Sequence, residues 1–179
     1  MFEKTIHAYC RGLSYLMAIS LAVMVLLVFG NVVLRYAFNS GITLSEELSR
    51  WLFVWMTFLG AIVAMNEKAH LGSDTLISRM PLEVKKLFYV IGHALMLFVC
   101  WLLFDGSWKQ AVINLETTSA VMEASMAIFY SCGVVAAISI ALILMNNLWR
   151  LLTGQLEEGD LIGVRESEEE PIDIPPPLK

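Results

Sequence analysis

The chain has 179 residues, 58% of them hydrophobic, and its mean hydropathy is +0.68. A soluble domain of this size cannot bury so much apolar surface, so the composition excludes that class and predicts an all-α integral membrane protein with several spans. The formal net charge of −5 does not point to nucleic acid as a partner, because residues 154–179 alone carry eight acidic and two basic side chains.

Four apolar runs predict four transmembrane helices, at about residues 13–34, 44–65, 87–104 and 126–145. The first run is too long for the core of a secretion signal, and no small-residue cleavage site follows it, so we expect it to remain in the protein. The four spans are expected to form one membrane domain, residues 1–153, embedded in the lipid bilayer.

The connection between the first two spans has the features of a tight turn. Residues 39–41 read Asn-Ser-Gly, a cluster that favours turns. Thr43 is followed three residues later by Glu46, which matches the capping-box pattern. The second helix is therefore predicted to begin near Leu44.

Two charges of each sign flank this turn. Arg35 ends the first span, and Glu46, Glu47 and Arg50 begin the second. Glu46 and Glu47 precede Arg50 by four and three residues, and such helical pairs each contribute about 0.2–0.5 kcal/mol. Two interpretations stay open. The four residues are an ordinary charged edge, or Arg35 bonds Glu46 or Glu47 across the turn and locks the helices together, with part of the cluster touching a partner protein.

Small residues recur at helical spacing in three of the expected spans, which is typical of close helix packing. They are Ser14, Ala18 and Ala22, then Gly60 and Ala64, then Gly133, Ala137 and Ala141. Trp51 lies near the start of the second span, where a tryptophan of the interfacial belt is expected, and Trp55 faces lipid or a partner helix. We expect these small and aromatic faces to mediate helix packing, including packing against another subunit.

Residues 31–74 resemble a known family, the DctQ-like small membrane subunit of tripartite ATP-independent periplasmic (TRAP) transporters. The matching residues are Asn31, Arg35, Tyr36, Phe38, Asn39, Glu46, Glu47, Leu48, Arg50, Phe53, Trp55, Phe58, Leu59, Gly60, Ala61 and His70. Elsewhere the resemblance rests on chain length and the number of spans.

The resemblance implies a function and two protein partners. A large permease subunit would carry the substrate and sodium sites, and a periplasmic binding protein would deliver an organic acid such as a C4-dicarboxylate, a sialic acid or a keto acid. This chain would brace the large subunit in the bacterial inner membrane and help to dock the binding protein. Within the matched stretch, Arg35, Tyr36, Glu46, Glu47 and Arg50 are the candidate structural or interface residues.

The connection after the second span and the C-terminal segment are polar. In residues 66–86, Ser73 and Asp74 could cap a short helix that Pro81 would end, lying flat on the membrane surface. Residues 154–179 are acidic and proline-rich and cannot bury a core, so they are predicted to be a disordered cytoplasmic tail.

The distribution of basic residues predicts the orientation. Nine bases lie on the side of the two termini and three on the side of the first turn. The nine are Lys4, Arg11, Lys68, Arg79, Lys85, Lys86, Arg150, Arg165 and Lys179, and the three are Arg35, Arg50 and Lys109. The positive-inside rule therefore predicts that both termini are cytoplasmic and that the charged turn faces the periplasm.

No sequence pattern indicates an enzyme, a metal site or a cofactor. The three cysteines form no metal-binding pattern, and no phosphate-binding loop or catalytic triad is apparent. His93 is the only histidine within a span, so a bis-histidine heme would lack its second ligand, and His93 is expected to hydrogen-bond at a helix contact. Two other functions remain as alternatives: a membrane anchor of a redox enzyme, or a self-contained four-helix exporter.

Overall fold

The computed structural model describes residues 2–66 and 82–153, and the side chains of most of them. These residues form four helices: α1 (Phe2–Phe38), α2 (Thr43–Asn66), α4 (Leu82–Ile113) and α5 (Met126–Leu152). All four are long and apolar enough to cross a membrane, which confirms the predicted all-α, four-span architecture. The short interfacial helix expected before Pro81 and the acidic tail lie outside the described residues.

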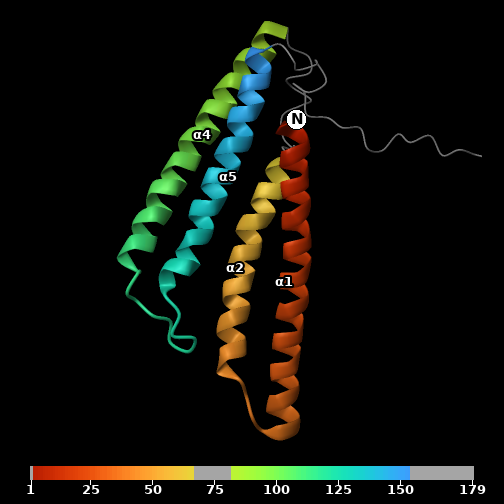
Figure 1. Cartoon of the computed structure of the whole chain (residues 1–179), viewed down its shortest axis with the longest axis vertical. Helices are drawn as coiled ribbons and strands as arrows, with labels where there is room; N and C mark the ends of the chain where they lie inside the picture. The colour runs from red at the N-terminus through yellow and green to blue at the C-terminus, as the bar shows by residue number, and fades with distance from the viewer. Residues whose placement is uncertain (1, 67–81, 154–179) are drawn as a thin grey trace, which may run out of the picture.

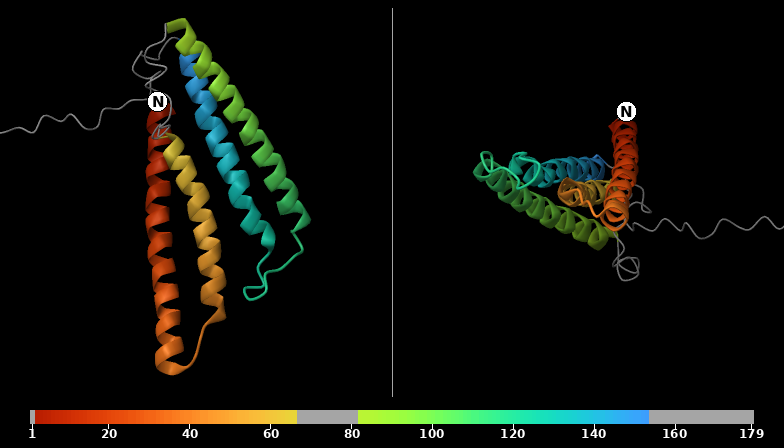
Figure 2. Two further views of the ribbon diagram at one scale, coloured as in Figure 1. Left: turned by 180° about the vertical axis from the view of Figure 1, so that it is seen from behind. Right: turned by 90° about the horizontal axis from the view of Figure 1, so that it is seen from below.

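The helices stand in a row in the order α1, α2, α5, α4 (Figure 1). Contacts join α1 to α2, α2 to α5, and α5 to α4, so α2 and α5 are the central helices. Viewed from below, α1 and α4 lie toward opposite ends of the arrangement (Figure 2). The row therefore has two outer helices, α1 and α4, and each packs mainly on one neighbour.

The contact between α1 and α2 follows a seven-residue repeat. Along α1, the residues covered by neighbouring helices recur at alternating spacings of three and four, which is the pattern of a coiled-coil seam. They are Cys10, Leu13, Met17, Ser20, Met24, Leu27, Asn31 and Leu34. The expected small-residue face of α1 is different, because Ser14, Ala18 and Ala22 are exposed and do not face α2.

The main core joins α1, α2 and α5 in the half of the molecule that contains the N-terminus. Its buried residues are Cys10, Leu13, Leu59, Ile62, Val63, Ala136 and Ile143. Two polar contacts add to it: Tyr9 Oη lies 3.1 Å from Ser139 Oγ of α5, and Asn66 Nδ2 lies 3.5 Å from His7 Nδ1. Toward the other end of the molecule, α1 keeps its contact with α2 through the rest of the seam, in which Asn31 is a polar member.

Helix α4 is longer than the apolar run that predicted it. The sequence placed the edge of the third span at Asp105-Gly106, but the helix continues to Ile113. The apolar run marks the part suited to hydrocarbon, whereas a helix can continue into the polar layer when its side chains are satisfied there. Asp105 and Lys109 meet this condition, because Lys109 Nζ donates to Asp105 Oδ2 at 2.6 Å, one turn along the helix.

Candidate functional site

The α1–α2 turn is closed by the side chain of a buried asparagine. Asn31 Oδ1 accepts the backbone N–H of Ile42 at 2.7 Å, and only 7% of Asn31 is exposed. Asn39 adopts a positive φ of 50°, which ends α1, and the N–H of Ser40 donates to the Leu34 carbonyl at 3.1 Å. The sequence correctly placed a turn here, although it gave Asn31 no part in it.

A second polar contact holds the first turn of α2 against α1. Ser45 Oγ donates to the Leu27 carbonyl at 2.6 Å, and Ser45 is buried. Helix α2 begins at Thr43, so Ile42 precedes the first helical residue and Thr43 is not the cap that the capping-box pattern predicted. The predicted boundary near Leu44 is within one residue of the observed one.

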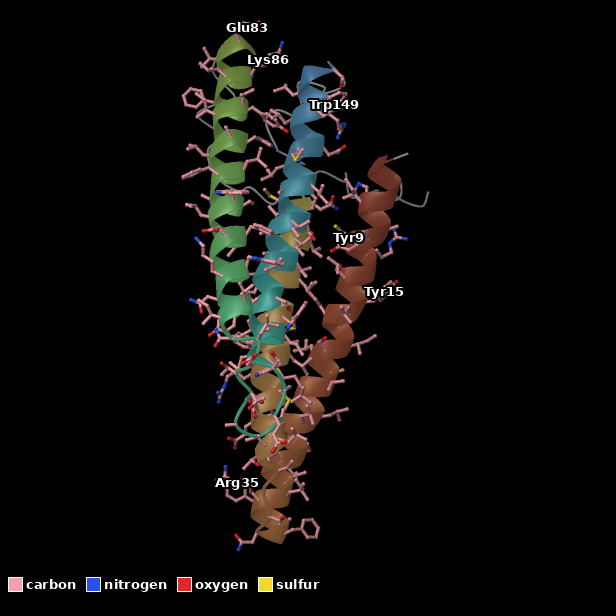
Figure 3. The ribbon with its side chains drawn as sticks, turned by 60° about the vertical axis from the view of Figure 1, so that its left-hand side comes forward. Tyr9, Tyr15, Arg35, Glu83, Lys86 and Trp149 are labelled. Atoms are coloured by element: carbon pink, nitrogen blue, oxygen red, sulfur yellow. The ribbon has the colours of Figure 1, made fainter. Side chains whose placement is uncertain are left out.

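Arg35 pairs with Glu46 across the turn. The Arg35 Nη1–Glu46 Oε1 distance is 3.8 Å, and both side chains are about two-thirds exposed (64% and 63%). The pairing that the sequence suggested is therefore confirmed, but an exposed pair at this distance contributes about 0–1 kcal/mol. Arg35 lies at the end of the molecule opposite Glu83 and Lys86 (Figure 3). The neighbouring Tyr36 is 89% exposed.

Glu47 has a different role from the one its spacing suggested. Its Oε2 accepts two backbone N–H bonds from the α4–α5 loop, from Val121 at 2.9 Å and from Met122 at 3.1 Å. Neither Glu46 nor Glu47 pairs with Arg50 in the described part of the chain, so the expected helical pairs are wrong. A carboxylate that accepts two adjacent amides is a strong anchor, because hydrogen bonds to a charged acceptor exceed neutral ones in strength.

The loop that Glu47 holds is itself ordered by hydrogen bonds. Ser119 N–H donates to the Ala124 carbonyl and Met126 N–H to the Thr117 carbonyl, each at 2.8 Å. Ser125 caps α5 by accepting the Ala127 N–H, and its hydroxyl donates to the Leu115 carbonyl at 2.7 Å. The loop is thus a compact turn whose tip is fixed to α2 rather than a free connection.

Trp51 joins the two central helices. It is only 8% exposed, and its ring lies 5.8 Å from that of Phe129 on α5 at an angle of 60°. This contact agrees with the part in helix packing that was expected of Trp51, and its position in an interfacial belt stays a prediction. Trp55, one turn further on, is half-buried.

The small residues of α5 serve contacts within the chain. A methyl group at Gly133 would collide with Ser107 Oγ of α4, so the absence of a side chain permits this close approach. Ala137 is 1% exposed, and the adjacent Ala136 belongs to the main core. Gly60 faces Met17 of α1 at an ordinary contact distance of 3.6 Å from the position of an added Cβ. The packing role expected for Gly133 and Ala137 is confirmed within the chain, and their contact with another subunit stays a prediction.

His93 is buried, and its ring is stacked on that of Tyr89 at 4.0 Å between centroids. His93 Nδ1 also lies 3.0 Å from the Tyr89 carbonyl, one turn earlier in α4. Among the described residues, no group of three or more His, Cys, Asp or Glu side chains is placed to hold a metal ion.

Sequence reasoning missed three contributions to this edge: the Asn31 amide that closes the turn, the Ser45 hydroxyl that holds α2 against α1, and the loop amides that bind Glu47. A polar residue at a covered position of the α1 seam is the signal that could have identified Asn31. The loop amides carry no such signal, because every non-proline residue has an N–H.

The fold and this edge define a small multi-pass membrane protein in which the start of α2 takes part in holding both described connections. Comparison with known proteins gives the family: the model of the "Tripartite ATP-independent periplasmic transporters, DctQ component" matches residues 24–154. The chain belongs to this family and is a TRAP small permease subunit, and family membership implies association with a large permease subunit.

Three relatives illustrate this similarity. A Haemophilus influenzae protein named as a TRAP transporter small permease protein is 38% identical over 83% of this chain and 92% of its own length. The C4-dicarboxylate TRAP transporter small permease protein DctQ of Vibrio cholerae is 36% identical over 53% of this chain and 41% of its own length. The sialic acid TRAP transporter permease protein SiaT of Haemophilus influenzae is 35% identical over 44% of this chain and 12% of its own length.

Proposed function

We propose that this subunit is a scaffold for the large permease subunit in sodium-coupled, binding-protein-dependent uptake of an organic acid. The observation that carries the scaffold role is that no Asp, Glu, Lys or Arg side chain is buried among the described residues. The buried polar or charged side chains of the described residues are Asn31, Ser45, Ser49, His93 and Ser119. A carrier of ions or of charged solutes usually needs ionisable groups or broken helices near the centre of the bilayer.

The relatives support the substrate class. One carries C4-dicarboxylate in its name and another carries sialic acid, and both of these are organic acids. The SiaT match covers only 12% of that permease, so a segment similar to this chain occurs within a much longer permease protein. Such an arrangement fits a small subunit that works beside a large one, together with a periplasmic substrate-binding protein.

Uptake by purified components in liposomes tests the scaffold role. With a sodium gradient and binding protein present, liposomes that contain both membrane subunits should accumulate the organic acid. Liposomes that contain this chain alone should accumulate none. Accumulation by this chain alone would refute the scaffold role, and sodium-independent uptake by the full system would refute the coupling.

The proposed topology places both termini in the cytoplasm of a bacterium, with the chain in the inner membrane. The N-terminus and Lys86 lie toward one end of the molecule and Arg35 toward the other (Figures 1 and 3), and the larger number of bases on the side of Lys86 supports this orientation under the positive-inside rule. Alkaline phosphatase fused after Lys179 should be inactive, and a cytoplasmic reporter fused there should be active. The opposite pair of results would reverse the topology.

A further inference from the structure

Beyond Leu44, the exposed residues of α2 form a single line along the helix, which we name the α2 stripe. Its members are Glu46, Arg50, Phe53, Thr57, Ala61 and Ala64. Spacings of three and four residues place them on one face. Because α2 is a central helix that packs against α1 and α5, this face is the part of its surface that neither neighbour covers.

The α2 stripe differs in chemistry from the exposed surfaces of the other helices. The other central helix exposes only large apolar side chains over its described residues, namely Ile128, Ile138, Leu142, Met145 and Trp149. The outer helices also expose many large apolar side chains, such as Leu26 and Phe29 of α1 and Leu95 and Phe98 of α4. Those surfaces suit lipid chains. The α2 stripe has one large apolar side chain, Phe53, beside two charges, a threonine and two alanines, and this mixture suits contact with protein.

Arg50 lies at a level where α1 is apolar. Ser45 bonds Leu27 and Gly60 faces Met17, so Arg50, between Ser45 and Gly60, lies level with the apolar segment 17–27 of α1. At this same height along the bundle, α5 is in its own first turn, because Trp51, next to Arg50, contacts Phe129. Arg50 is exposed, and no hydrogen bond or ion pair joins it to another described residue. An unpaired guanidinium at such a level calls for a partner outside the chain.

We propose that one transmembrane helix of the large permease subunit docks along the α2 stripe and presents a carboxylate to Arg50. Ala61 and Ala64 permit close approach of the two backbones. Between them and Arg50, the Thr57 hydroxyl donates to the Phe53 carbonyl at 2.9 Å and can still accept a hydrogen bond from the partner. A carboxylate is the complementary group, because the guanidinium donates two parallel hydrogen bonds to it. This assignment rests on the proposed function and adds the face that the large subunit occupies.

Photo-cross-linking in the intact complex tests the face. A photoreactive amino acid replaces Thr57 or Ala61 in the stripe, and Leu95 of α4 or Leu142 of α5 serves as the matched exposed control. Adducts with the large subunit are expected from the two stripe positions and not from the two controls. Large-subunit adducts from the controls alone, or lipid adducts from all four positions, would overturn the assignment. Failure of the unmodified chain to co-purify with the large subunit would instead count against the proposed function.

Charge variants test the role of Arg50. Arg50→Glu should lower the large subunit recovered with the tagged chain by about tenfold or more, whereas Arg50→Lys should retain most of it. The isolated Arg50→Glu chain should unfold at the same temperature as the wild type, because Arg50 bonds no other described residue. Equal loss of stability in the isolated chain would show an intramolecular role and overturn the proposal. Full recovery together with a change only in bound anionic lipid would assign Arg50 to a lipid phosphate and also overturn it.

Discussion

The two connections at the charged end of the molecule are held in different ways. The α1–α2 turn, residues 39–42, is closed by side chains of the helices it joins, through Asn31 and Ser45. The α4–α5 loop, residues 114–125, is held by Glu47 of α2, a helix that it does not join. A short turn can be fixed locally, whereas a longer loop loses more conformational freedom on ordering and gains from an external anchor.

The comparison shows that α2 organises both connections from one short segment. Ser45 points to α1, Glu47 points to the α4–α5 loop, and Arg50 is exposed. The rotation of about 100° per residue in an α-helix lets three nearby residues serve three directions. The segment that begins α2 therefore connects the two halves of the bundle, and it leaves one charged group for a partner.

The largest effect is expected from the anchor of the long loop. Glu47→Ala removes a charged acceptor from two amides, and we expect a loss of about 2–3 kcal/mol in the free energy of unfolding. Thermal or denaturant unfolding of the purified subunit in detergent measures this loss. Hydrogen exchange at Val121 and Met122 should accelerate at the same time.

The matched control for this change is Glu46→Ala on the adjacent residue. Glu46 is exposed and bonds Arg35 only at 3.8 Å, so its removal should cost less than about 1 kcal/mol and leave exchange in the α4–α5 loop unchanged. Equal effects of the two substitutions would contradict the assignment of Glu47 as the anchor of the loop.

The sequence predicted the spans and the short turn because those depend on local pattern. The apolar runs placed four helices, and Asn-Ser-Gly placed the turn at 39–41. The partner of Glu47 could not be predicted in this way, because Arg50 was available three residues away and the loop amides come close only after α2 and α5 pack. The contact of Trp51 with Phe129 could not be predicted for the same reason, since the two residues lie far apart in the chain.

A smaller effect is expected from the buried amide of the short turn. Asn31→Ala leaves the Ile42 N–H without its acceptor and removes a side chain that is only 7% exposed, and we expect a loss of about 1–2 kcal/mol. Asn114→Ala, at the first residue after α4, is the control. The side-chain amide of Asn114 bonds only Gln110, in the last turn of α4, and Asn114 is less buried than Asn31. The control should change the free energy of unfolding by less than half as much. A reversed order would show that the α1–α2 turn closes without Asn31.

The smallest effect is expected from Arg35, although it is the most conspicuous charge at this end of the molecule. Its pair with Glu46 is exposed and long, so Arg35→Ala should cost less than about 1 kcal/mol, and a double-mutant cycle with Glu46→Ala should give a coupling energy that disappears at high salt. Part of any loss would come from packing, because the Arg35 side chain lies against Gly41, where an added Cβ would be 3.0 Å from Arg35 Cγ. Arg35→Met separates the two contributions, since it keeps an apolar stem over Gly41 and removes the charge. We expect Arg35→Met to be closer to wild type than Arg35→Ala in the same unfolding measurement. If Arg35→Met instead cost more than Glu47→Ala, the short turn would depend on its ion pair, and the contrast between a locally closed turn and an externally anchored loop would be wrong.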